Sequence, residues 1–119
     1  MPTLRRWRIL QWRMIIIETS TFTRQITELL PDDLYRELQE ALWVNPTQGA
    51  LIPGSGGLRK IRWQLPGKGK RGGIRVIYYW YSPAVQIYML LAYGKSEQEN
   101  LTTQQLKVLK TLVEQEFES

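Results

Sequence analysis

The chain has 119 residues and a formal net charge of +5, with 43% apolar and 23% charged residues. A chain of this size and composition is typical of one globular domain that buries a core without disulfides or metals. Cysteine and histidine are both absent. Their absence excludes disulfides, thiolate zinc sites, and the commonest general base and metal ligand. We therefore expect neither a metal nor a cofactor.

The N-terminus is basic, and its sequence is MPTLRRWRILQWR. Its apolar residues are singly spaced, without the continuous apolar core of a signal peptide. We expect residues 1–13 to be a poorly ordered extension and residues 14–119 to form the folded domain. A basic helix lying on a membrane surface is the alternative. No apolar run in the chain is long enough to predict a membrane span.

The first half of the domain predicts one strand and two helices. Met14–Glu18 is a short β-branched run typical of a buried strand. From Ser20 onward, apolar residues recur at three- and four-residue spacing, which indicates an amphipathic helix. Pro31 begins a second helix at its favoured first-turn position, and Asn45-Pro46 ends it. Two helices in series predict a helical hairpin.

The second half predicts three strands after a Gly/Pro-rich connector at 49–57. In the first strand, Ile61, Trp63 and Leu65 alternate with Lys60, Arg62 and Gln64. The next two strands are Gly73–Tyr81 and Val85–Tyr93, and their short links predict antiparallel neighbours.

A final helix is predicted from Thr102, because Thr102 and Gln105 have the spacing of a capping box. The element order is then β-α-α-β-β-β-α. This order predicts an α+β fold with a mainly antiparallel four-stranded sheet, a helical hairpin and a C-terminal helix. We expect the helices to lie on one side of the sheet.

Charge is distributed unevenly, because the stretch from Ala41 to Ser96 contains no Asp or Glu. Its cations are Arg59, Lys60, Arg62, Lys68, Lys70, Arg71, Arg75 and Lys95. A block of unneutralised cations is costly to fold unless a polyanion is the partner. The pattern favours a phosphate-binding site over a solvated basic face.

The segment Gly67–Gly73 matches G-x-G-x-x-G, but a strand follows it and not the helix that a dinucleotide loop requires. We interpret it as a mobile loop that presents Lys68, Lys70 and Arg71 to a phosphate backbone. A flexible hairpin with solubilising charges is the alternative.

Three cations are predicted to meet on the sheet. Lys60 and Arg62 share a strand face by alternation, and Arg75 lies on the neighbouring strand. Held by the sheet, they could clamp one phosphodiester, and the cluster would lower the pKa of Lys60. Strand aromatics could stack bases, but Tyr93 alternates with Met89 and Leu91, so we assign it to the core by default.

Several runs resemble the RelE/HigB toxins of bacterial type II toxin–antitoxin modules. They are Gly57–Arg62, the basic loop leading into 74–79, and Tyr93-Gly94-Lys95 before Asn100-Leu101-Thr102. Together with the element order, the match is closest to the HigB-like branch and covers about residues 14–117.

The resemblance implies a cytoplasmic RelE-like toxin that cleaves messenger RNA on the ribosome and so inhibits translation. Such an mRNA interferase is a metal-independent endoribonuclease that uses the substrate 2′-OH as nucleophile. The implied partners are the ribosome, the message and a cognate antitoxin, a HigA-like helix-turn-helix protein. No membrane partner is implied.

Site residues follow from the resemblance and from the charge pattern together. The catalytic set is Lys60, Arg62, Arg75, Lys95 and Tyr93, and the RNA-binding set is Arg59, Lys68, Lys70, Arg71 and Tyr79. The chain departs from the family pattern at Ser96, where many members have a second basic residue, and at Thr102, where they have a tyrosine. Lys60 is the preferred general base, and Tyr79 or Tyr93 is the alternative.

The sequence leaves two other functions open. A ParE-like toxin acting on DNA gyrase would not need Lys60, Arg62 and Arg75 to converge tightly. A non-catalytic RNA-binding module would use the same charges without chemistry.

Overall fold

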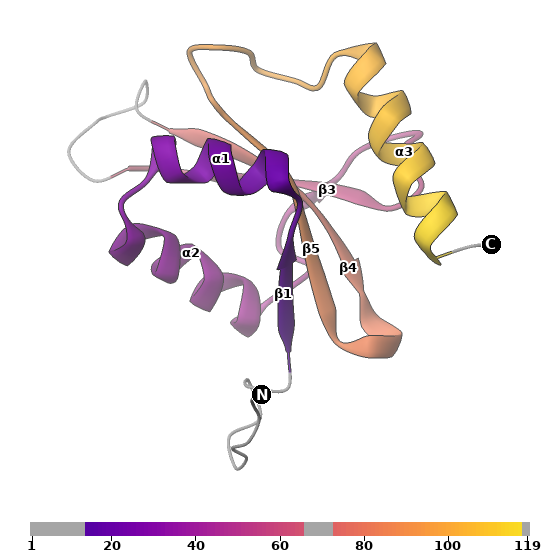
Figure 1. Cartoon of the computed structure of the whole chain (residues 1–119), viewed down its shortest axis with the longest axis horizontal. Helices are drawn as coiled ribbons and strands as arrows, with labels where there is room; N and C mark the ends of the chain where they lie inside the picture. Colours follow the sequence, from indigo (N-terminus) through magenta and orange to yellow (C-terminus); the bar gives the residue numbers. More distant parts are fainter. Residues whose placement is uncertain (1–13, 66–72, 118–119) are drawn as a thin grey trace.

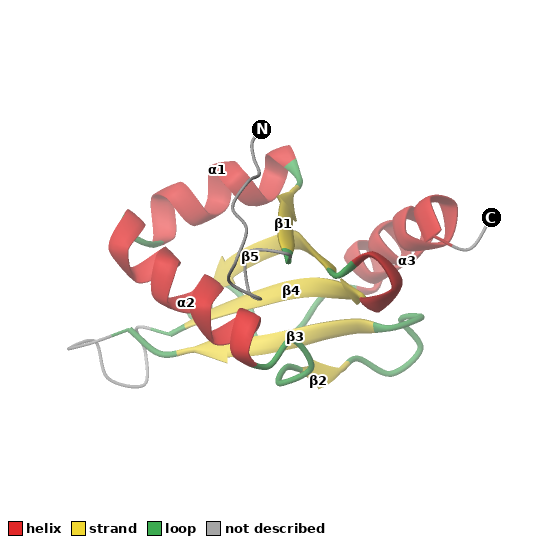
Figure 2. Ribbon diagram, turned by 90° about the horizontal axis from the view of Figure 1, so that it is seen from below, coloured by secondary structure: helices red, strands yellow, loops and turns green. Residues whose placement is uncertain are grey.

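The structure is a computed structural model that describes residues 14–65 and 73–117, and Figure 1 labels its helices α1 to α3 and all of its strands except β2, which is labelled in Figure 2. In chain order they are β1 (Ile15–Glu18), α1 (Ser20–Leu29), α2 (Asp32–Val44), β2 (Ala50–Leu51), β3 (Leu58–Trp63), β4 (Ile74–Tyr81), the 3-10 helix η3 (Ser82–Ala84), β5 (Gln86–Gly94) and α3 (Thr103–Phe117). The predicted α+β class, the helical hairpin and the C-terminal helix are confirmed.

Within the described residues, the strands form one sheet in the order β1-β5-β4-β3-β2. β1 pairs with β5 in parallel, and the other neighbours are antiparallel. The sheet has five strands, whereas the sequence predicted four, because β2 was assigned to the Gly/Pro-rich connector. β2 pairs Ala50 with Lys60 and Leu51 with Arg59. Two residues are too few to show an alternating pattern.

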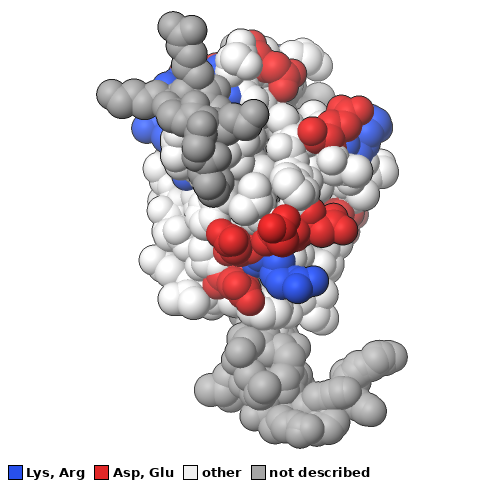
Figure 3. Space-filling view, turned by 90° about the vertical axis from the view of Figure 1, so that its left-hand side faces the viewer, with Lys and Arg blue, Asp and Glu red and all other residues white. Residues whose placement is uncertain are grey.

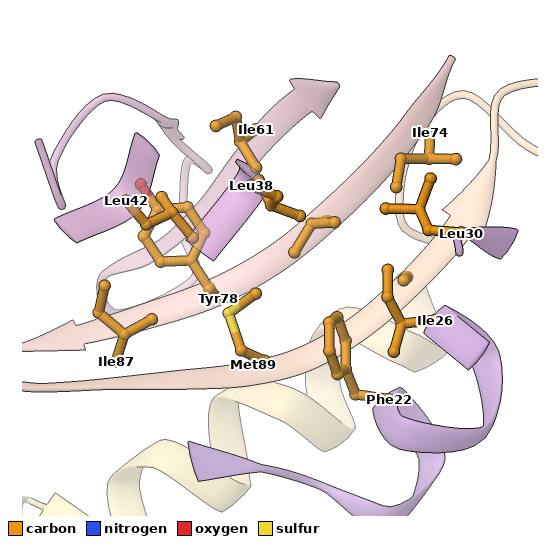
Figure 4. Close-up of a cluster of buried hydrophobic side chains, with 12 residues drawn as sticks. Phe22, Ile26, Leu30, Leu38, Leu42, Ile61, Ile74, Tyr78, Ile87 and Met89 are labelled. Atoms are coloured by element: carbon orange, nitrogen blue, oxygen red, sulfur yellow. The ribbon is translucent and has the colours of Figure 1, made fainter. Parts of the chain in front are cut away.

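The helical hairpin packs on one face of the sheet. Its buried residues Phe22, Ile26, Leu30, Leu38 and Leu42 join strand residues Ile61, Ile74, Val76, Tyr78, Ile87, Met89 and Ala92 in one cluster. Figure 4 shows most of this cluster, with Tyr78 and Met89 pointing from the strands toward the hairpin side chains. In β4, alternate residues from Ile74 to Tyr78 supply this face.

α3 packs on the opposite face, which corrects the prediction that the helices share one side. Leu109 and Val113 of α3 cluster with the strand residues of that face, among them Leu58 and Ile77. The hairpin and α3 lie well apart in both ribbon views (Figure 2). The sequence pattern missed this because both sheet faces are apolar over part of their length.

Tyr93 also faces α3, although the sequence placed it on one face with Met89 and Leu91. Leu91 and Tyr93 belong to the α3-side cluster, whereas Met89 belongs to the hairpin-side cluster. The pairing of β4 with β5 shifts register between Ile77 and Tyr78, as in a β-bulge. A bulge changes which side chains point to each face beyond it.

α3 begins with the predicted capping box. The Thr102 hydroxyl accepts from the Gln105 N–H at 3.0 Å, and the Gln105 side-chain oxygen accepts from the Thr102 N–H at 3.0 Å. The reciprocal bonds fix the point where the loop after β5 becomes helix. None of the helices in the described ranges has the length and apolar character that crossing a bilayer requires.

Candidate phosphate-binding site

The strand register brings Lys60, Arg62, Arg75 and Tyr93 onto the α3-side face of the sheet. Arg62 of β3 lies directly opposite Arg75 of β4, and Arg75 lies opposite Tyr93 of β5. Lys60 lies opposite Ile77, whose side chain packs with α3. Directly opposed residues share a face and are close neighbours. The cations thus lie on the same face of the sheet as the apolar residues that pack against α3.

A carboxylate, Glu99, lies at the centre of these cations. Its Oε2 accepts from Arg75 Nε at 3.1 Å and from Arg75 Nη2 at 3.0 Å, and its Oε1 accepts from Arg75 Nη2 at 3.2 Å. Arg62 Nη2 lies 3.6 Å from the same Oε2. The two guanidinium groups therefore already share one anion.

The loop between β5 and α3 holds Glu99 over the cluster. Lys60 Nζ donates to the Asn100 side-chain oxygen at 2.7 Å and to the Glu99 carbonyl at 3.4 Å. The Tyr93 hydroxyl donates to the same carbonyl at 3.4 Å. Lys60 and Tyr93 thus bond the loop at the Glu99 carbonyl and, for Lys60, at the Asn100 side chain. Arg62 and Arg75 instead pair with the Glu99 carboxylate.

The members of the cluster differ strongly in burial. The Arg75 side chain is 7% exposed, whereas the Arg62 and Glu99 side chains are 66% and 46% exposed. Arg75 is therefore fixed by the sheet. Arg62 and the Glu99 carboxylate stand at the surface, where solvent or a ligand can reach them.

Ionisation of the cluster follows from these contacts. Burial lowers the pKa of Lys60, and the charges of Arg62 and Arg75 add to this effect while Glu99 opposes it. Hydrogen bonding by Arg75 lowers the pKa of Glu99, helped by the neighbouring charges. Burial raises the pKa of Tyr93. At neutral pH, Glu99 is thus a stable carboxylate and Lys60 is more readily deprotonated than an ordinary lysine.

Arg59 and Tyr79 do not join the cluster. Arg59 lies opposite Tyr78 on the hairpin side, where its Nη1 donates to the carbonyls of Thr47 at 2.9 Å and Gly49 at 2.8 Å. It therefore supports the link between α2 and β2. The Tyr79 ring stacks on Phe117 with centroids 5.1 Å apart, which places it in the packing beneath α3.

Lys95 follows β5 directly and is half-buried, and its backbone N–H donates to the Gly73 carbonyl at 3.0 Å. Within 14–65 and 73–117, Glu99 makes its ion pairs with Arg62 and Arg75, so Lys95 is not one of its partners. The predicted RNA-binding residues Lys68, Lys70 and Arg71 lie outside the described residues.

Glu99 and Asn100 were not predicted as site residues from the sequence. The acid-free stretch that indicated the site ends at Ser96, and Glu97 and Glu99 are the first acids after it. The position of these acids in the sequence could have indicated their role. An acid that closely follows a basic block, on the loop after the last strand of that block, can neutralise the cations of the block. Only the folded position of the loop between β5 and α3 shows that Glu99 reaches Arg75.

Acidic side chains gather elsewhere on the molecule. Glu28, Asp32, Asp33, Glu37 and Glu40 are exposed on the helical hairpin, and Figure 3 shows a band of acids on that side. Among the described residues, no group of three or more acidic side chains is arranged to hold a metal ion. The cluster on the α3 side, where Arg62 and Arg75 already pair with a carboxylate, is suited to binding an anion.

No family model matches the sequence. In structure the chain is similar to the E. coli toxin RelE, solved in its free state as a mutant with two arginines replaced by alanine, with a TM-score of 0.51. The match covers 84% of this chain and 96% of that one, at 14% sequence identity. The chain has a RelE-like fold. The fold implied by the sequence resemblance is thus confirmed, and the HigB-like branch remains a prediction.

Proposed function

We propose that this RelE-like protein is the toxin of a type II toxin–antitoxin module and an mRNA interferase of the HigB-like branch. The observation that carries the proposal is the convergence of Lys60, Arg62 and Arg75 on one sheet face, where both arginines pair with the Glu99 carboxylate and Lys60 bonds the loop that bears it. Arg62 and Arg75 offer the forked donors that bind phosphate oxygens. The RelE-like fold adds support for this reading.

RNA cleavage needs little from such a site, because the substrate supplies its own nucleophile. The 2′-oxygen attacks the adjacent phosphorus, and the bond to the 5′-oxygen breaks. The departing 5′-oxygen takes a proton from water, so the products are a 2′,3′-cyclic phosphate and a 5′-hydroxyl. Arg62 and Arg75 would stabilise the charge that develops on the phosphate oxygens. Lys60, whose pKa is lowered by burial and by Arg62, would accept the 2′-proton.

The partners follow from the same reading. The ribosome would present the message in the orientation that in-line attack requires. A cognate antitoxin, in this branch a helix-turn-helix protein, would neutralise the toxin, and an acidic segment is suited to the basic face that bears Lys60 and Arg62.

The test is cleavage of a reporter message during cell-free bacterial translation, mapped by primer extension. Arg62→Gln should reduce cleavage by about a hundredfold or more, as expected when a donor to a developing phosphate charge is lost. Arg62 is 66% exposed, so its substitution should leave the fold intact. Arg36→Gln is the matched control, because it removes the same charge from an exposed position on α2.

Codon-phased cuts that disappear in Arg62→Gln and persist in Arg36→Gln would support the proposal. A supercoiling defect without cuts would indicate the ParE-like alternative. Ribosome or RNA binding with neither effect would indicate a non-catalytic RNA-binding module.

A further inference from the structure

The paired N–H donors of the Arg75 guanidinium bind a carboxylate and do not face open solvent. Glu99 takes up both Nε and Nη2 of Arg75, at 3.1 Å and 3.0 Å. An arginine binds a phosphate bidentately through the same kind of paired N–H donors that it uses for a carboxylate. A phosphate that used these donors of Arg75 would therefore meet Glu99 already in place.

Of the two partners, Glu99 is the one that can leave. The Arg75 side chain is 7% exposed and projects from a central strand, whereas the Glu99 side chain is 46% exposed and projects from a loop. Swinging the carboxylate into water keeps it hydrated and uncovers little apolar surface. Moving Arg75 would instead disturb a buried position between β3 and β5.

The loop can stay in place while the side chain moves. Lys60 and Tyr93 hold the loop by hydrogen bonds to the Glu99 carbonyl, and Lys60 also bonds the Asn100 side chain. Within the loop, the Gln98 side chain donates to the Asn100 carbonyl at 2.8 Å. These contacts do not use the Glu99 carboxylate, so exchange at Arg75 requires only a rotamer change.

We infer that Glu99 is the resident anion of the site, and that a backbone phosphate of single-stranded RNA displaces it from Arg62 and Arg75. The inference rests on the proposed function for the nature of the ligand and adds a regulatory step to it. The free toxin holds its phosphate site closed with its own carboxylate. RNA binds by anion exchange, so the apparent affinity is lower than the cations alone would give.

The experiment measures binding of a short 2′-O-methyl RNA by fluorescence anisotropy at low salt. This probe has no free 2′-hydroxyl, so binding is measured without cleavage. Glu99→Gln keeps the shape of the side chain but removes the competing charge, and it should tighten binding about tenfold or more, as expected for a charge removed from beside a phosphate at a protein surface.

Glu97→Gln is the matched control. It lies on the same loop and changes the net charge equally, but its side chain accepts from the Gly94 N–H at 3.1 Å and pairs with none of the cluster cations. Its affinity gain should be about threefold or less, reflecting only the general change in charge. Equal gains in the two variants, or no binding by either variant, would overturn the inference.

A measurement on the unmodified protein guards against misfolding of the variants. On saturation with the probe, the carboxyl carbon resonance of Glu99 should move to the value of a free glutamate while the Arg75 Nε–H resonance also shifts. An unchanged Glu99 carboxyl resonance at saturation would refute exchange. Because the probe is not cleavable, exchange without message cleavage in the translation assay would overturn the proposed function alone.

Discussion

At the scale of single residues, three arginines on neighbouring strands have three different roles because of their position in the register. Arg59 faces the hairpin and donates to backbone carbonyls. Arg62 faces the α3 side at the surface, and Arg75 faces the same side but is buried against Glu99. A shift of one residue along a strand moves a side chain to the other face of the sheet. A position on a more central strand leaves a side chain less exposed than one nearer the edge.

Lys60 allows a direct test of proton transfer. A neutral lysine can accept the 2′-proton, and burial beside Arg62 lowers the pKa of Lys60 and so raises its neutral fraction. Cleavage should therefore rise with pH and level off at a lower pH than an ordinary lysine would give. Lys60→Arg keeps the charge but cannot lose a proton, so cleavage should fall about a hundredfold or more while ribosome binding is retained.

Tyr93→Phe is the companion variant, because it keeps the ring packing and removes only the hydroxyl. Tyr93 is 3% exposed, and burial raises its pKa, so the phenolate form that could accept a proton becomes scarcer, whereas burial and Arg62 lower the pKa of Lys60 and make its neutral form more available. We expect Tyr93→Phe to cleave near the unmodified rate. The opposite pattern, with Lys60→Arg active and Tyr93→Phe inactive, would assign the base to Tyr93.

At the scale of elements, the β5–α3 loop connects the site to the C-terminal helix. The loop carries Glu99 and Asn100 over the cations, and it ends two residues later in the capping box of Thr102 and Gln105. The cap fixes where α3 starts and therefore how much chain remains to cross the cation cluster. Helix geometry and site geometry are linked through this short segment.

Thr102→Ala should lower the free energy of unfolding by about 1 kcal/mol, because the Gln105 N–H loses its side-chain acceptor. Urea unfolding followed by circular dichroism measures the change. Thr103→Ala is the matched control one residue along, inside the helix and exposed, and it should change stability by less than about 0.5 kcal/mol. Equal effects at both positions would argue against the cap as a stabilising contact.

At the scale of the whole molecule, the two sides of the sheet differ in their exposed charge. The hairpin side bears the exposed acids of α1 and α2 (Figure 3), whereas the α3 side bears Lys60, Arg62 and Arg75 together with Glu99. The acids of the hairpin repel an approaching polyanion, so its approach to the α3 side is favoured before contact. The net charge of +5 by itself does not show this arrangement.

The basic segment between β3 and β4 offers a test at this scale. Replacing Lys68, Lys70 and Arg71 together with alanine should weaken RNA or ribosome binding and reduce its salt dependence. Each lost phosphate contact on a single strand reduces the slope of log affinity against log salt by about 0.7. The affinity is measured over a range of salt concentrations. An unchanged slope would mean that these cations only solubilise the segment.

Much of the fold was predictable because local patterns are strong where one face is buried. The alternation of Lys60 and Arg62 with Ile61 and Trp63 predicted a strand and its two faces, and the Thr102–Gln105 spacing predicted the start of α3. The sequence also identified Lys60, Arg62 and Arg75 as a cluster, since neighbouring strands with short links must pair.

Only the tertiary structure decided the side of the sheet that α3 covers, the pairing of β2 and the placement of Glu99. Each depends on segments far apart in the chain: Leu109 and Leu58 share one buried cluster, Ala50 pairs with Lys60, and Glu99 pairs with Arg75. Local patterns carry period and propensity but no information about which distant partner a side chain meets. For this reason the sequence predicted the cations of the site, and only the fold revealed the carboxylate that occupies it.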